Sequence, residues 1–264
     1  METDTLSITI GARPISLSYF ARPAPGEPVL YLHGLGCTKR DFTGAAEQDG
    51  LPGHALLAFD FPGCGESPNP PGEPLSVDDL VEIARAFLQA RGVESATVVG
   101  HSMGGLTALK FAVRYPSMVR RLVSVEGNLA PEDCFFSRQA LQYEYSEFER
   151  TFYTEFEQWL VAAGKQGYAW YAEHLRESAA APAFYHYCRS IVAHSDTDPL
   201  TAEFIRLEIP RLLIYGSESA GLTYLATLAA AGVPLHEVPE SSHFPAYSNP
   251  GDYYRAIREF LKST

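Results

Sequence analysis

The amino-acid sequence predicts an α/β protein in which a mostly parallel β-sheet is wound by helices on both faces and carries one helical insertion. Short apolar runs typical of buried strands alternate with amphipathic segments along most of the chain. A glycine-rich turn at residues 100–105 joins one such strand to a helix. This alternation stops between residues 130 and 207, where aromatic residues become frequent. We therefore expect a core of residues 1–129 and 208–264, with residues 130–207 forming a helical lid.

The first elements of the core are expected to be an antiparallel hairpin. Strand-like segments at residues 6–10 and 15–20 flank a turn that contains glycine and proline. A proline-rich link leads to a buried strand at residues 29–32. Farther along, Ser76 opens a helix with an acidic start that resembles a capping box, and Gly92 ends it. These features concern packing and carry no chemistry.

The turn Gly100-His101-Ser102-Met103-Gly104 is the strongest indication of chemistry in the chain. An apolar strand-like run, residues 96–99, precedes it, and a helical pattern over residues 106–115 follows it. Glycines on both sides allow Ser102 to adopt the strained turn that lifts its hydroxyl clear of the sheet, beside the amino end of the following helix. We interpret Ser102 as a nucleophile.

Two further segments stand where partners of such a serine are needed. The buried strand at residues 29–32 ends in His33-Gly34-Leu35-Gly36, whose glycines let backbone N–H groups approach a substrate oxygen. Near the carboxyl end, His243 follows a strand-like segment at residues 235–238 and precedes a terminal helix. An arbitrary histidine is more often a surface or capping residue, so the position of His243 is what favours its interpretation as a general base.

Together these motifs resemble the alpha/beta-hydrolase superfamily, and in particular its esterases and lipases that use a serine nucleophile and carry a helical lid. The resemblance covers most of the chain. It implies that Ser102 attacks an acyl carbon, that His243 is its base, and that the N–H groups of Leu35 and Met103 form the oxyanion hole. Residues 58–67 are similar to the Asp-x-x-Gly-x-Gly-x-Ser loop of the family, in which we expect Asp60 to hold the turn. The resemblance implies no metal and no organic cofactor.

The third member of the catalytic triad departs from the family pattern. Most relatives carry an acid three residues after the glycine that ends the seventh strand, but this position is Ser219 here. A short loop follows, and we expect the next helix to open at Leu222. Two carboxylates could replace the missing acid, namely Glu126 at the end of the sixth strand and Glu218. We favour Glu126, because Gly127 frees the backbone after it, and Glu218 remains the alternative.

The predicted lid is rich in aromatic residues, since 15 of the 32 in the chain lie in the 53 residues from Phe135 to Tyr187. Their spacings of three and four residues are typical of helix packing, which is the simplest interpretation of any one of them. As a group they would roof an apolar pocket if the lid lies where the family places it. We therefore predict substrate contacts from residues of the lid and of the two glycine-rich turns: His33, Gly34, His101, Phe148, Phe152 and Trp159.

The composition limits the possible partners. The 264 residues carry 20 basic and 32 acidic side chains, a net charge of −12, which argues against nucleic acid and anionic membranes as partners. No targeting segment and no apolar stretch long enough to span a membrane is apparent, and the 4 cysteines lack the spacing of a zinc site or a disulfide framework. We expect a cytoplasmic protein with reduced thiols. The oligomeric state stays open.

These observations predict a serine hydrolase that cleaves an ester-type acyl bond of a small, largely apolar substrate through an acyl-enzyme intermediate. A thioesterase, a C–C hydrolase and an acyltransferase remain alternatives, because the fold does not determine the reaction. A protein of another class is also possible, namely one that binds a small ligand with little turnover. The sequence does not identify the acyl group or the leaving group.

Overall fold

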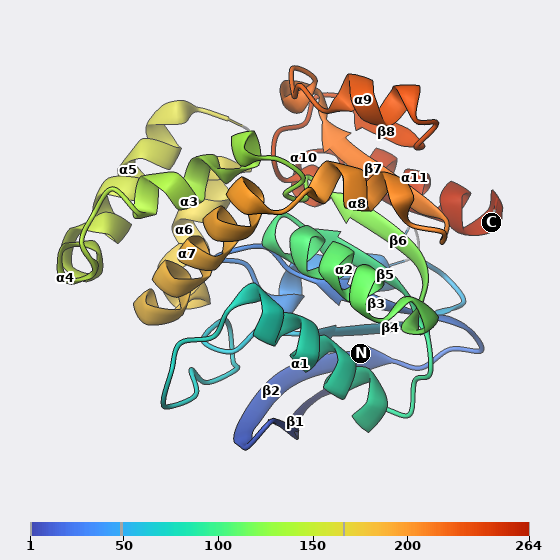
Figure 1. Ribbon diagram of the computed structural model, residues 1–264, viewed down its shortest axis with the longest axis horizontal. Helices are drawn as coiled ribbons and strands as arrows, with labels where there is room; N and C mark the ends of the chain where they lie inside the picture. The colour runs from blue at the N-terminus through green and yellow to red at the C-terminus, as the bar shows by residue number, and fades with distance from the viewer. Residues whose placement is uncertain (1, 48–49, 166, 264) are drawn as a thin grey trace.

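A computed structural model describes residues 2–47, 50–165 and 167–263. Its strands form one eight-stranded sheet in the order β1-β2-β4-β3-β5-β6-β7-β8 (Figure 1). Every neighbouring pair from β4 to β8 is parallel, while β2 is antiparallel to both β1 and β4. The predicted fold class and the predicted amino-terminal hairpin are confirmed. The strands are β1 (Glu2–Ile10), β2 (Arg13–Arg22), β3 (Gly26–Leu32), β4 (His54–Phe59), β5 (Ala96–His101), β6 (Val119–Val125), β7 (Arg211–Gly216) and β8 (Leu235–Val238).

Helices cover both faces of the sheet, and a separate group lies to one side of it (Figure 1). The apolar strand β5 is buried at all of its residues, as expected for a central strand with both faces covered. The α-helices are α1 (Val77–Ala90), α2 (Met103–Arg114), α3 (Phe135–Ala140), α4 (Tyr145–Glu147), α5 (Tyr153–Ala163), α6 (Tyr168–Ser178), α7 (Ala181–Thr197), α8 (Leu200–Arg206), α9 (Leu225–Ala230), α10 (Pro245–Ser248) and α11 (Pro250–Ser263).

Two helix starts test the local predictions. Ser76 caps α1 through a capping box with Asp79, as the sequence predicts. The helix expected to open at Leu222 instead begins at Leu225, so that prediction was wrong. A 3-10 turn at Ser217–Ser219 and a further turn, closed by a hydrogen bond from the Leu222 N–H to the Ser219 carbonyl, use these residues first.

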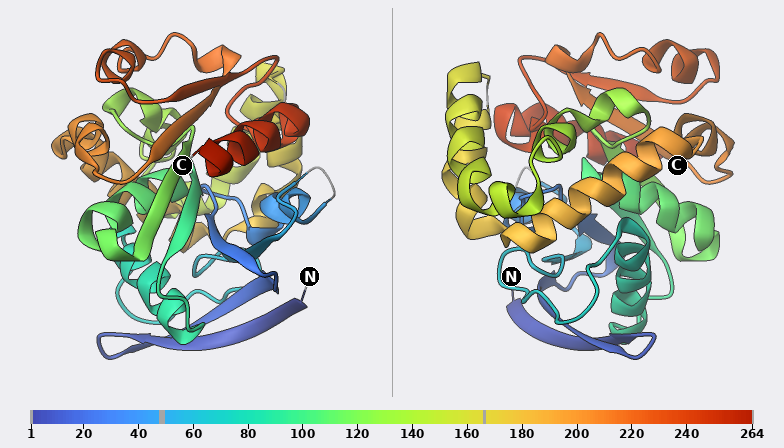
Figure 2. Two further views of the ribbon diagram at one scale, coloured as in Figure 1. Left: turned by 90° about the vertical axis from the view of Figure 1, so that its right-hand side faces the viewer. Right: turned by 60° about the vertical axis from the view of Figure 1, so that its left-hand side comes forward.

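The chain between β6 and β7, called the insertion below, contains α3 to α8 and no strand among its described residues. Figure 2 shows α5 and α6 side by side at one end of the molecule, with α7 running back toward the core. Aromatic rings fill the interior of the insertion: the ring centroids of Phe148 and Phe152 are 4.5 Å apart, and those of Phe152 and Phe156 are 4.8 Å apart. The division of the chain into a core and a lid at residues 130 and 207 stays a prediction.

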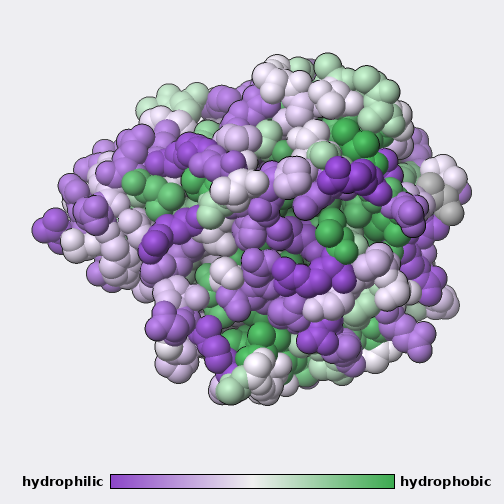
Figure 3. All heavy atoms as spheres, in the orientation of Figure 1, coloured by the Kyte–Doolittle hydropathy of each residue, from purple (hydrophilic) through white to green (hydrophobic). Residues whose placement is uncertain are grey.

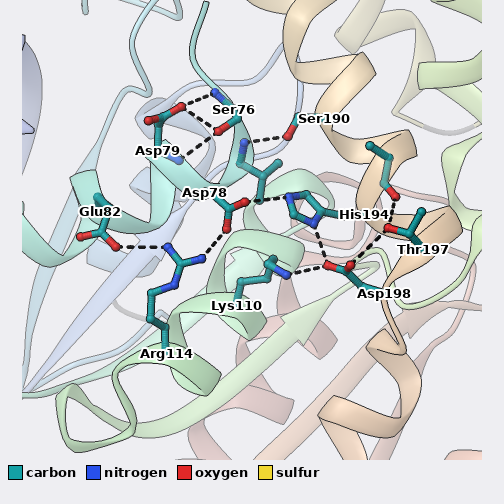
Figure 4. Close-up of polar contacts among 12 residues, drawn as sticks. Ser76, Asp78, Asp79, Glu82, Lys110, Arg114, Ser190, His194, Thr197 and Asp198 are labelled. Carbon is teal, nitrogen blue, oxygen red and sulfur yellow. Dashed lines mark hydrogen bonds and ion pairs between the residues drawn. The ribbon is translucent and has the colours of Figure 1, made fainter. Parts of the chain in front are cut away.

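A network of charged side chains joins α7 to two core helices (Figure 4). Asp198, directly after α7, accepts hydrogen bonds from Lys110 of α2 at 2.6 Å and from His194 Nδ1 at 2.7 Å. On its other side, His194 Nε2 lies 3.4 Å from Asp78 of α1. These pairs are partly exposed, so they orient the insertion more than they stabilise the fold.

The face of the molecule in Figure 3 is largely hydrophilic, with hydrophobic groups interspersed. Among the described residues, the large hydrophobic side chains that remain exposed are Val113, Phe135, Trp159 and Val161. Three of these four belong to the insertion. None of the helices in the described part of the chain has the length and apolar character needed to cross a bilayer.

Candidate active site

Ser102 lies on a strained turn between β5 and α2. Its φ and ψ are 52° and −119°, a conformation that side chains rarely adopt. A Cβ atom at Gly100 would lie 2.2 Å from the Gly104 carbonyl oxygen, and one at Gly104 would lie 2.1 Å from that of Leu32. Neither position could carry a side chain, because the backbone of another residue approaches each glycine too closely. The turn presents Ser102 at the amino end of α2, where N–H groups have no acceptor within the helix.

Ser102, His243 and Leu35 line one cavity, called the inner cavity below, whose volume of about 10 Å³ is room for about one water molecule. The structure thus brings together the predicted nucleophile, the predicted base and one predicted oxyanion residue. Met103, the other predicted oxyanion residue, is fully buried and starts α2. The remaining wall consists of His101, Asn128, Asp133, Phe136, Ser137, Tyr171, Ile191 and Phe244.

Of the two candidate acids, Glu126 lies beside His243. Its Oε2 is 3.2 Å from His243 Nδ1, and the two side chains are only 5% and 7% exposed. Glu218 is 40% exposed and instead pairs with Lys165 at 3.2 Å. A carboxylate at Nδ1 accepts a hydrogen bond from the N–H of that nitrogen, which leaves the lone pair of His243 Nε2 to accept a proton.

The carboxylate of Glu126 is held by two more donors. The Gly216 N–H donates to Oε1 at 2.7 Å, and the Ser219 hydroxyl donates to Oε2 at 3.0 Å. Ser219 occupies the sequence position where most relatives carry the acid. Its hydroxyl donates a hydrogen bond to the carboxylate of Glu126. The backbone of Glu126 has a φ of 48°, which is uncommon for a residue with a side chain. With the Nδ1–H of His243, three donors hold the carboxylate in place.

His33 is a structural residue of the loop after β3. It is fully buried, its Nε2 accepts the N–H of Phe61 at 2.8 Å, and its Nδ1 lies 2.8 Å from the Gly34 carbonyl oxygen. Nδ1 therefore carries the proton and donates to that oxygen. Burial lowers the pKa of His33 to about 4. With both nitrogens engaged, His33 is not among the residues that line the inner cavity. The predicted substrate contact is not found there.

His101 lines the inner cavity, whereas Gly34 is not among its lining residues, and both act on the geometry of the site. His101 Nε2 is 2.8 Å from the carbonyl oxygen of His243, and burial lowers the pKa of His101 to about 3. The neutral ring therefore donates its Nε2 proton to that carbonyl. A Cβ atom at Gly34 would lie 2.8 Å from His101 Nδ1 and 3.2 Å from Ser102 Cβ. Gly34 thus allows the loop after β3 to approach the serine.

Tyr171 of α6 holds the oxyanion loop from the side of the insertion. Its hydroxyl donates to the Leu35 carbonyl at 2.8 Å, and the side chain is 1% exposed. The neighbouring Gly34 carbonyl accepts the His33 ring and the Cys37 N–H at 3.2 Å. Both carbonyls of the loop are therefore occupied by internal donors. The sequence analysis missed Tyr171, because one tyrosine among many on a helix carries no local signal.

Asp60 has the structural part that the sequence predicts. It is fully buried and accepts the Lys39 N–H at 2.7 Å, the Lys39 ammonium at 2.6 Å and the Glu66 N–H at 2.9 Å. These bonds fasten the loop after β4 to the loop after β3.

The predicted aromatic contacts divide into two groups. Trp159 is 38% exposed and lines a second cavity that His243 also borders. Phe148 and Phe152 are buried in the interior of the insertion and line neither cavity bordered by His243. Stacking on their neighbours accounts for their position, as the helix-packing interpretation expects. The sequence analysis instead missed Phe135 and Phe136, whose rings lie edge-on to His243 with centroids 5.4 and 5.6 Å away.

Comparison with known proteins agrees with this geometry. A family model described as alpha/beta hydrolase fold matches residues 27–178, and the chain belongs to this family. It is 40% identical over 106 residues to "Lipase 1" of Psychrobacter immobilis, a match that spans 38% of this chain but only 32% of the lipase. It is 26% identical over 265 residues to "Putative carbamate hydrolase RutD" of Variovorax paradoxus, which spans 90% of this chain and 93% of that protein. The family thus has hydrolase activity among its members.

A solved structure shows the same fold over nearly all of the chain. It comes from work on the carboxylesterases of Nitrososphaera gargenis, with a TM-score of 0.81 and 14% identity over 97% of this chain and 98% of that one. In the described part of our chain, no group of three or more His, Cys, Asp or Glu side chains is arranged to hold a metal ion.

The low pKa of His101 makes stability depend on pH in a predictable direction. The unfolded chain, with a pKa near 6.5, binds a proton as the pH falls to 5, whereas the folded protein, with a pKa of about 3, does not. As the pH falls from 7 to 5, the free energy of unfolding should therefore decrease, with a contribution of about 2 kcal/mol from His101. His101→Gln keeps a hydrogen-bond donor but does not titrate in this range. Between pH 7 and 5, measured by urea unfolding, we expect its free energy of unfolding to decrease by about 2 kcal/mol less than that of the unchanged protein. Equal losses would contradict the assignment.

Proposed function

We propose that this protein is a serine hydrolase that cleaves an ester-type acyl bond through an acyl-enzyme intermediate. The observation that carries the proposal is the convergence of Ser102 and His243 on one cavity, with Glu126 at His243 Nδ1. Hydrolases among the similar proteins support the general class of reaction. The substrate would be a small molecule whose acyl carbon reaches the hydroxyl of Ser102.

In the first half of the proposed reaction, Ser102 Oγ attacks the acyl carbon and its proton passes to His243 Nε2. The negative charge that develops on the acyl oxygen is held by the N–H groups of Leu35 and Met103. As the tetrahedral intermediate collapses, the bond to the leaving group breaks, and the leaving oxygen takes the proton from His243. The acyl group is then bound to Ser102 Oγ.

In the second half, water replaces the leaving group. His243 takes a proton from the water as its oxygen attacks the acyl carbon, and the collapse of the second intermediate returns that proton to Ser102 Oγ. Throughout, the Glu126 carboxylate accepts a hydrogen bond from the Nδ1–H of His243, so that it fixes the tautomer of His243 and stabilises the imidazolium. The closest chemical variant is a carbamate, which offers the same kind of acyl carbon, and the similarity to "Putative carbamate hydrolase RutD" makes carbamates the second substrate class to test.

The first prediction concerns the nucleophile. Ser102→Ala removes only a hydroxyl from a turn that already favours small residues, so the fold should persist while the hydrolysis of p-nitrophenyl acetate falls by about 10³-fold or more. A fluorophosphonate probe should label the unchanged protein and not this variant. His243→Ala should cause a similar loss, and the double variant should lose little more, because the two residues act as a unit. More than a tenth of the original activity in Ser102→Ala would refute the proposal.

The second prediction concerns the acid. Glu126→Gln should lower kcat by about 10² to 10⁴, because the amide no longer stabilises the imidazolium. Glu218→Gln, the matched control at the other candidate, should cost less than about tenfold because Glu218 pairs with Lys165 instead. Adding Ser219→Asp to Glu126→Gln should restore at least about tenfold of the lost kcat, since Ser219 Oγ lies 3.0 Å from the lost carboxylate oxygen. The assignment is reversed if Glu218→Gln causes the larger loss.

The third prediction concerns Tyr171 as a positioning residue. Tyr171→Phe removes the hydroxyl that holds the Leu35 carbonyl, so we expect kcat to fall by about tenfold with little change in KM. Tyr187→Phe is the matched control, because this buried tyrosine of the insertion also donates to a core carbonyl, that of Pro62, at 2.8 Å. Both variants should lose similar thermal stability, by about 1 kcal/mol. If Tyr171 had a purely structural role, Tyr171→Phe and Tyr187→Phe would have equal kcat values.

A further inference from the structure

Two cavities meet at His243. The inner cavity contains Ser102 and Leu35 and has a volume of about 10 Å³, room for about one water molecule. The second, called the outer cavity, has a volume of about 320 Å³ and is lined by residues of the insertion and of the loop after β7. Among the described residues that line them, His243 alone borders both. The outer wall comprises Phe135, Trp159, Ala163, Lys165, Tyr168, Glu218, Ser219, Gly221, Leu222 and His243.

Two consecutive phenylalanines separate the cavities. Phe136 is 7% exposed and lines the inner cavity, whereas Phe135 is 37% exposed and lines the outer one. Both rings stand edge-on to His243, with interplanar angles of 83° and 87°, and their centroids are 4.2 Å apart. The imidazole of His243 thus contacts one aromatic ring that lines the inner cavity and one that lines the outer cavity.

The proposed reaction, on which this inference rests, assigns a part of the substrate to each cavity. The acyl carbon must reach Ser102 Oγ and the N–H of Leu35, and both residues line the inner cavity only. The leaving oxygen must lie beside the imidazole that protonates it, and His243 also borders the outer cavity. We propose that the inner cavity takes a short acyl group and the outer cavity takes a neutral, aromatic leaving alcohol.

The walls of the inner cavity limit the length of the acyl group. Ile191 and Tyr171 are 2% and 1% exposed, and Phe136 closes the side toward the outer cavity. Such close-packed side chains leave little room to shift. Because the space between them holds only about one water molecule, an acyl chain longer than that of acetate would have to displace one of them.

The walls of the outer cavity favour an aromatic group without charge. Phe135, Trp159 and Tyr168 contribute three rings, and the centroids of Trp159 and Tyr168 are 6.2 Å apart. A further ring gains from edge or offset contact with such a set. The charged residues Lys165 and Glu218 lie 3.2 Å apart and balance each other, so they favour neither a cationic nor an anionic group.

A four-ester matrix tests the assignment: benzyl acetate, ethyl acetate, benzyl butyrate and ethyl butyrate. We expect Trp159→Ala to lower kcat/KM about tenfold for both benzyl esters and less than about twofold for both ethyl esters. Val161→Ala is the matched control, since Val161 lies on the same helix, is 61% exposed and does not line the cavity. Ile191→Ala should raise the ratio of butyrate to acetate about threefold with either alcohol. Ile191→Val should move this ratio in the same direction if the alanine variant fails to fold.

The results separate this inference from the proposed function. If Trp159→Ala changes the ratio of butyrate to acetate and not that of benzyl to ethyl, the outer cavity holds the acyl group and the assignment is wrong. An equal loss on all four esters would also overturn the assignment of the two cavities. If the fluorophosphonate still labelled Ser102 in that case, the proposed serine hydrolase function would stand. No hydrolysis of any ester and no labelling would remove the proposed function itself, and the assignment with it.

Discussion

The close approach of Gly104 to β3 is the constraint on which the site depends. With a Cβ atom at this position only 2.1 Å from the Leu32 carbonyl oxygen, any other residue would push α2 away from the sheet. The contact brings the amino end of α2 beside the loop that follows β3. Gly34 continues the same contact, because a Cβ atom there would lie 3.2 Å from Ser102 Cβ. Ser102 and the loop after β3 are therefore neighbours because two side chains are absent.

The order of the strands explains how the acid can change its position without moving the histidine. The strands β5, β6, β7 and β8 are consecutive in the sheet and parallel, so their carboxyl ends lie along one edge. Ser102, Glu126 and Ser219 follow three neighbouring strands in turn, and His243 follows the fourth. Because β6 and β7 are adjacent, a carboxylate from either can reach the same point. The hydrogen bond from Ser219 to Glu126 marks that point.

The sequence indicated those parts of the structure that depend on consecutive residues. A strand, a glycine-flanked turn and a helix follow one another at Ser102, and the backbone conformation needed there is written into the local pattern. The choice between Glu126 and Glu218 depends on where two separate loops meet, which no pattern of consecutive residues specifies. Tyr171 and the pair Phe135 and Phe136 left no local signal, since only the packing of helices decides which ring on an aromatic helix faces the site. For the same reason the sequence could not indicate that Phe148 and Phe152, predicted as substrate contacts, are buried inside the insertion.

The insertion contacts the core through the hydroxyl groups of buried tyrosines as well as through their rings. Tyr171 donates to the Leu35 carbonyl and Tyr187 donates to the Pro62 carbonyl, each at 2.8 Å. A tyrosine suits this place because its ring packs among apolar residues while its hydroxyl satisfies a loop carbonyl that water cannot reach. Any movement of α6 away from the core must break the bond to Leu35 and release the loop that bears the proposed oxyanion donor. The hydrogen bond from Tyr171 thus links the position of α6 to that of the loop after β3.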